Sequence, residues 1–277
     1  MTTAVEPREH AIEARGLRFH YVEWGEAGAP PVVLLHGLSS TGRIWDPLAR
    51  ALQDRYRLIA LDQRGHAETS WPDGPDYATD DFAGDLEALV EAWGLARFAL
   101  IGLSMGGMNA MAYAARHSQR LTHLVVVDIP PWVDRTKDPA RAYYQHIAEA
   151  GHPPFDDHDA ALRAIRLTNQ VTPDDSLRHR LRHLLKQLPD GRWTYRSDPR
   201  ISYHWQPADL WEELPKVAAP ALIVRGGKTN VFSAKAAERM RATFTNAQLV
   251  TIDEAGHTVP EDTPETFIAA VEAFLAN

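Results

Sequence analysis

The chain has 277 residues, of which 44% are hydrophobic and 24% charged, and its formal net charge is −8. This composition is typical of a globular protein, and an acidic chain without a basic stripe is not expected to bind nucleic acid. Cysteine is absent, which excludes disulfides, a thiolate metal site and a cysteine nucleophile.

Two alternating stretches open the chain at 10–14 and 17–24, and the glycine between them predicts a hairpin. The run PVVLLHG then has the length of a strand buried on both faces of a parallel sheet. The same pattern predicts five further buried strands, at 56–62, 98–104, 121–129, 221–227 and 247–253.

Helical spacing of apolar residues separates these strands at 82–93, 108–115 and 267–274. Asp80 and Asp81 suit the start of the first of these helices, and Pro264 suits the first turn of the last. The alternation predicts an α/β fold, with a mostly parallel eight-stranded sheet covered by helices on both faces.

The alternation stops between Ile129 and Pro220, a connection of about 90 residues that must have structure of its own. This segment is rich in histidine, arginine and aromatic residues. We predict a helical cap at 131–212, inserted over the carboxyl edge of the sheet, between two parts of one core domain at 1–130 and 213–277.

Ser104 lies in Gly-Leu-Ser-Met-Gly-Gly, directly after a predicted strand and before a predicted helix. Glycines two residues before and after the serine permit a sharp turn that raises the hydroxyl at the helix N-terminus. A serine hydroxyl needs a base to become a nucleophile. His257, just past the last predicted strand, is the candidate base, because its loop is expected at the same edge of the sheet.

Negative charge that develops on a substrate oxygen needs hydrogen-bond donors. The backbone amides of Met105 and Leu38 are the candidates, since both follow predicted strands at this edge. We interpret His36 as structural and expect Asp62 and Arg64 to fix their loop by ion pairing. Leu103 and Trp132 are candidates for lining the substrate pocket.

With these motifs the chain resembles the α/β-hydrolase superfamily over essentially its whole length. The resemblance rests on HG at 36–37, DQRGH at 62–66, GLSMGG at 102–107, RGG at 225–227 and GH at 256–257. The chain is similar to the capped, cofactor-free esterases, lactonases and C–C hydrolases, and GLSMGGM is similar to the motif of 3-oxoadipate enol-lactonases. The resemblance implies a serine hydrolase that cleaves a small ester, lactone or related acyl compound without a cofactor.

Two positions depart from the family pattern. The family usually has an aspartate a few residues past the strand that ends near Gly226, where this chain has Asn230. Three explanations remain open: Asp128 supplies the carboxylate, Asn230 orients His257 as a weaker partner, or the triad is impaired. In addition, Ala67 stands where the family commonly has glycine, which predicts a small change in loop shape.

Other functions remain open for the same scaffold. Asn230 keeps a non-hydrolytic or slow-turnover sensor of small molecules in consideration, and a perhydrolase or lyase would use the same serine and histidine. We expect a cytoplasmic protein, monomeric or homodimeric, that does not act on membranes. The apolar runs are shorter than a bilayer span, and the start MTTAVEPREH does not resemble a secretory signal.

Two further patterns resemble a phosphate-binding loop and a zinc site, but neither is complete. Gly227-Lys228-Thr229 lacks the first glycine of a phosphate-binding loop. His179 and His183 have the i, i+4 spacing of a zinc helix, but no glutamate follows the first histidine and arginines surround the pair. We interpret this pair as part of a solvated basic helix face and predict no metal site.

Overall fold

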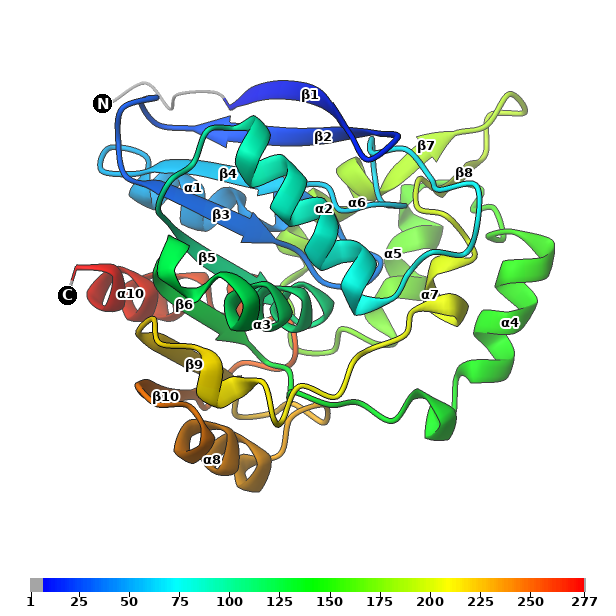
Figure 1. Cartoon of the computed structure of the whole chain (residues 1–277). Coiled ribbons are helices and arrows are strands. Elements are labelled where there is room, and N and C mark those ends of the chain that lie inside the picture. The colour runs from blue at the N-terminus through cyan, green and yellow to red at the C-terminus, as the bar shows by residue number, and fades with distance from the viewer. Residues whose placement is uncertain (1–6, 277) are drawn as a thin grey trace.

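The computed structural model describes residues 7–276, which contain one eight-stranded sheet with the order β1-β2-β4-β3-β5-β6-β9-β10 (Figure 1). The first two strands are antiparallel to their neighbours and the other six run parallel to one another. The mostly parallel α/β sheet is therefore confirmed. The strands are β1 (Arg8–Ala14), β2 (Leu17–Trp24), β3 (Pro31–Leu35), β4 (Arg57–Leu61), β5 (Phe98–Leu103), β6 (Leu121–Val127), β9 (Ala221–Gly226) and β10 (Ala247–Ile252).

The predicted hairpin is present, and its turn explains the glycine. Arg15 has φ 48° and Gly16 has φ 76°. Two successive residues with positive φ form the turn whose twist matches that of the flanking strands.

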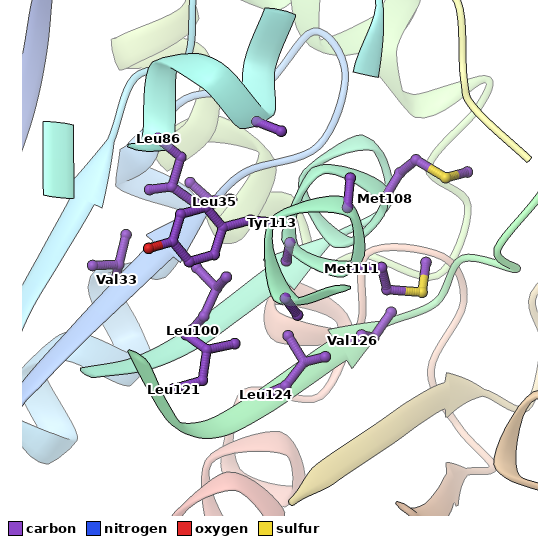
Figure 2. Close-up of a cluster of buried hydrophobic side chains, with 14 of the residues drawn as sticks. Val33, Leu35, Leu86, Leu100, Met108, Met111, Tyr113, Leu121, Leu124 and Val126 are labelled. Carbon is purple, nitrogen blue, oxygen red and sulfur yellow. The ribbon is translucent and has the colours of Figure 1, made fainter. Parts of the chain in front are cut away.

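Helices cover both faces of the sheet. On one face lie α2 (Thr79–Ala92), α3 (Met105–His117) and α8 (Ala234–Thr243), and on the other lie α1 (Asp46–Leu52) and α10 (Pro264–Leu275). Figure 2 shows part of the first layer, where Tyr113 and Met111 of α3 are directed toward apolar side chains of the strands. Because the central strands are apolar on both faces, they require this double cover.

One of the six strands expected to be fully buried departs from that prediction. β10 is the last strand of the sheet and pairs only with β9, and only its final residue, Ile252, is buried. An edge strand has one free side, so polar residues along it can remain in contact with water.

The segment between β6 and β9 forms a mainly helical insertion at the carboxyl ends of the parallel strands (Figure 1). It also contains a short two-stranded ribbon that was not expected, because each strand has only three residues. The elements are α4 (Arg141–Ala150), α5 (His158–Arg166), α6 (Asp174–Leu184), β7 (Leu185–Gln187), β8 (Trp193–Tyr195) and α7 (Ile201–His204). The short helix α9 (Val259–Asp262) lies between β10 and α10. Short 3₁₀ turns are formed by Gly42–Trp45, Ser118–Arg120, Arg135–Lys137 and Leu214–Lys216.

Two buried polar contacts hold the insertion on the core. Arg180 of α6 forms an ion pair with Glu261 of α9, and both side chains are buried. The Tyr77 hydroxyl donates to Asp198 over 2.5 Å. Breaking either contact would leave a buried polar group without a partner, which is why such pairs specify position.

The interpretation of His179 and His183 as part of a solvated face is wrong. Both are half-buried on α6, and they lie beside the buried carboxylate of Asp46 at the start of α1. The spacing of the two histidines along α6 was visible in the sequence, but their contact with α1 is tertiary.

The loops after β3 and β4 are joined by two buried histidines. The His36 Nε2 accepts from the Gln63 backbone amide over 3.0 Å, and the His66 Nε2 accepts from the Ser39 backbone amide over 3.1 Å. The two rings meet edge to face with centroids 4.7 Å apart. The structural role expected for His36 therefore agrees with its contacts.

The loop after β4 is also fixed by ionic contacts. Arg64 pairs with Asp85 of α2 through bonds of 2.5 and 2.6 Å, and Asp62 lies 2.7 Å from His20. Ala67 has φ 46°, so this alanine adopts the left-handed conformation for which glycine is better suited.

No helix within residues 7–276 is both long and apolar enough to cross a membrane. The prediction that the chain starts without a secretory signal rests on residues 1–10, of which residues 1–6 lie outside the described range.

Burial gives His66 a measurable effect on stability. Desolvation is the main cause that lowers the pKa of His66 from 6.5 to about 3. Between those values the unfolded chain binds a proton that the folded protein does not, so the free energy of unfolding falls as the pH falls. We expect a loss of about 2 kcal/mol from this residue between neutral pH and pH about 5. Urea denaturation should show a steeper dependence on pH for the wild type than for His66→Gln, and equal slopes would contradict this assignment.

Candidate active site

Ser104 occupies the turn between β5 and α3, with φ 52° and ψ −120°. A residue with a side chain rarely adopts these angles, and its amide is held by a 2.9 Å hydrogen bond to the Val127 carbonyl oxygen. The strained turn places the hydroxyl at the N-terminus of α3, as the motif predicts.

The glycines around Ser104 are required by close contacts. A Cβ on Gly102 would lie 2.2 Å from the Gly106 carbonyl oxygen, and one on Gly106 would lie 2.3 Å from the Leu35 carbonyl oxygen. A Cβ on Gly37 would lie 3.3 Å from the Ser104 Cβ. Backbone therefore approaches backbone on both sides of the turn, and the loop after β3 runs directly beside the serine.

His257 joins Ser104 to Asp128. Its Nε2 lies 3.0 Å from the Ser104 Oγ, and its Nδ1 lies 2.8 Å from the Asp128 Oδ2. A carboxylate can only accept, so Nδ1 carries the proton and Nε2 is free to accept from the serine hydroxyl. The Asp128 side chain is fully buried, whereas that of His257 is 33% exposed.

Asp128 lies just beyond β6 with φ 51°, a backbone conformation that aspartate tolerates better than most residues. Its Oδ1 accepts from the Gly226 amide over 2.9 Å, and its Oδ2 accepts from the Thr229 hydroxyl over 2.6 Å. Asn230, the neighbour of Thr229, is exposed, and its side chain has no hydrogen bond to His257 in the described structure. The structure therefore brings Asp128 to the imidazole and leaves Asn230 outside.

Thr229 is a contact that the sequence interpretation missed. We considered Asn230 in place of the expected aspartate and made no prediction for the Thr229 hydroxyl, one residue earlier. The only signal available was a hydroxyl residue directly after a strand at the carboxyl edge, which is too common to be specific.

The loop that carries His257 is fixed by Asp262 of α9. The carboxylate of Asp262 accepts from the Gly256 amide over 2.8 Å and from the Thr258 hydroxyl over 2.9 Å. It also accepts from the Thr172 hydroxyl of the insertion over 2.5 Å. These bonds hold the residues on both sides of His257, and they therefore fix the position of its imidazole.

The two candidate oxyanion donors lie on neighbouring segments. Met105 is the first residue of α3, where a backbone N–H has no acceptor within the helix. The Leu38 side chain packs on the small cluster that contains Met105. The next two amides of the Leu38 loop are already engaged, by His66 and by the Gly37 carbonyl.

The two pocket candidates differ in their surroundings. The side chain of Leu103 is almost fully buried in the core cluster shared with α1 and α10, so its side chain packs in the core instead of facing the insertion. Trp132, at the start of the insertion, is 45% exposed and remains available to a ligand.

Comparison with known proteins agrees with this architecture. The model of the alpha/beta hydrolase fold family matches residues 30–264. The sn-1-specific diacylglycerol lipase ABHD11 of Mus musculus is 29% identical over 257 residues, which cover 91% of this chain and 83% of the lipase. The 2-(acetamidomethylene)succinate hydrolase of Mesorhizobium japonicum is 28% identical over 253 residues, or 90% of each chain.

A crystal structure of E-2-(acetamidomethylene)succinate hydrolase superposes with a TM-score of 0.87 at 24% identity, covering 98% of this chain and all of the other. A likeness at this identity shows the fold. The match to the family model extends over most of the chain. The protein therefore belongs to the α/β hydrolase fold family, and its relatives by sequence support a hydrolase.

The close contacts around Gly106 lead to a stability prediction. Gly106→Ala would force a methyl group against the Leu35 carbonyl, and we expect it to lower the free energy of unfolding by about 3 kcal/mol or more. Gly28→Ala is the matched control, because a Cβ there meets nothing within 4 Å. We expect a change within about 0.5 kcal/mol for the control. Urea denaturation of both variants measures the difference, and similar losses would argue against the proposed contact.

Proposed function

We propose that the protein is a serine hydrolase that cleaves a small carboxylic ester, lactone or related acyl compound through an acyl-enzyme. The observation that carries the proposal is the continuous chain of hydrogen bonds from Asp128 through His257 to Ser104. This arrangement can remove the serine proton and stabilise the imidazolium that results.

In this mechanism the Ser104 oxygen attacks the substrate carbonyl while His257 takes the hydroxyl proton. The amides of Leu38 and Met105 donate to the oxyanion of the tetrahedral intermediate. His257 returns the proton to the leaving alcohol as the carbonyl reforms. A water molecule, deprotonated by the same imidazole, then attacks the acyl-enzyme. His257 passes this proton to the Ser104 oxygen as the acyl bond breaks, which releases the acid and restores the serine hydroxyl.

The relatives bear on the choice of substrate. One is named as a diacylglycerol lipase and the other as a 2-(acetamidomethylene)succinate hydrolase, so both names describe a hydrolysis. The aromatic residues of the insertion, including Trp132, suit a partly apolar substrate. Asp128 supplies a carboxylate to His257, which supports hydrolysis over the slow-turnover sensor that Asn230 had suggested.

A fluorophosphonate probe tests the nucleophile. We expect rapid covalent labelling of the wild type at one site and loss of labelling in Ser104→Ala. Ser118→Ala is the control, because Ser118 lies at the end of α3, away from the triad. An unlabelled wild type, or labelling that persists in Ser104→Ala, would count against a serine hydrolase.

A pair of substitutions tests the acid. Asp128→Asn keeps the shape of the side chain but removes the charge that stabilises the imidazolium, so we expect turnover to fall by two or more orders of magnitude, roughly. Asn230→Ala should change turnover only slightly. Steady-state kinetics on a panel of esters and lactones measure both, with thermal melting to verify folding. A larger loss in Asn230→Ala would reverse the assignment.

A further inference from the structure

A second cluster of polar side chains lies where the insertion meets the core. His179 and His183 project from α6 toward Asp46, the first residue of α1, and one ligand-type atom from each lies within 4.8 Å of the others. The Asp46 side chain is only 3% exposed. A carboxylate and two imidazoles are therefore gathered in one place, apart from the residues of the candidate active site.

The direction of His179 is unusual for a simple hydrogen bond. Its Nε2 is buried and lies 3.1 Å from the Asp46 Oδ2, which is close enough for an ion pair but lacks the alignment of a hydrogen bond. Two ligands of one ion point at the ion and not at each other. In a tetrahedral zinc site, bonds of about 2.0–2.2 Å place neighbouring ligand atoms about 3.3 Å apart. The 3.1 Å between the His179 Nε2 and the Asp46 Oδ2, together with their misalignment, fits shared ligation. All three ligand atoms lie within 4.8 Å of one another, so His183 has to adjust its position when an ion binds.

Three arginines bear on the strength of binding, of which Arg50 lies 4.0 Å from the Asp46 Oδ2. Arg43 donates to Asp46 over 2.9 Å, which positions the carboxylate but adds a positive charge beside it. Arg182 lies 3.1 Å from the His179 Nδ1 and is exposed. Coordination through Nε2 moves the ring proton to Nδ1, so the Arg182 side chain must turn away into solvent. We therefore expect weaker binding than at a dedicated structural zinc site.

An ion can reach this cluster from solvent. A cleft of about 250 Å³ opens between the insertion and the core, and its lining includes His183, Arg43 and Thr41. Three protein ligands leave a fourth position for water on this side.

We propose that Asp46, His179 and His183 bind one late first-row divalent cation, of the zinc or nickel class, that joins the insertion to the core. Imidazole nitrogens favour these ions over magnesium or calcium, which prefer oxygen ligands. Ligands from α6 and α1 would be joined by the ion, so its binding stabilises the docked position of α6. The absence of cysteine removes thiolates as competing ligands.

Calorimetric titration of the chelator-treated protein with zinc chloride and nickel chloride tests the proposal, together with thermal unfolding. We expect one bound equivalent and a higher melting temperature, and no response to magnesium chloride. His183→Ala and His179→Ala should each weaken this binding by about tenfold or more. His146→Ala is the matched control, because it removes an exposed imidazole from α4 and should leave the titration unchanged.

Two results would overturn the proposal. Absence of saturable binding would mean that the cluster is a polar junction without a metal. One equivalent that survives His183→Ala and disappears in His257→Ala would place the metal at the candidate active site. Neither readout depends on enzymatic turnover, so failure here is distinguishable from failure of the proposed hydrolase.

Discussion

The carboxylate of Asp128 is the contact on which the site's geometry depends. It is fully buried, and it accepts hydrogen bonds from the Gly226 amide, the Thr229 hydroxyl and the His257 imidazole. The first group belongs to the last residue of β9, and the other two lie in the loops after β9 and β10, while Asp128 itself follows β6. A buried charge of this kind is tolerated only when donors surround it. Because the Asp128 carboxylate needs hydrogen-bond donors, its contacts also join the carboxyl ends of β6, β9 and β10.

The local features of the site could be predicted from the sequence because they depend on neighbours along the chain. The glycines around Ser104 reflect backbone contacts within one turn, and the position of His257 follows from the rule that parallel strands end at one edge. The acid could not be chosen in this way. Asp128 and Asn230 both follow strands at that edge, and only the direction of their side chains, set in part by a positive φ at Asp128, distinguishes them.

The fold was predictable to a similar depth. Long apolar runs identified the central strands because burial on both faces leaves little choice of residue. Edge strand β10 and the three-residue strands of the insertion carry weaker patterns, since water or a short partner satisfies much of their surface. The contact between α6 and Asp46 was invisible for another reason, because it joins residues more than 130 positions apart.

The insertion and the histidine loop share α9 as an anchor. Glu261 pairs with Arg180 of the insertion, while the adjacent Asp262 binds both Thr172 of the insertion and the loop that carries His257. Replacing the insertion with one from another relative, in order to change substrate preference, would therefore also alter the support of the general base. A chimera should retain Arg180 and Thr172, or supply equivalents, if its imidazole is to keep its alignment.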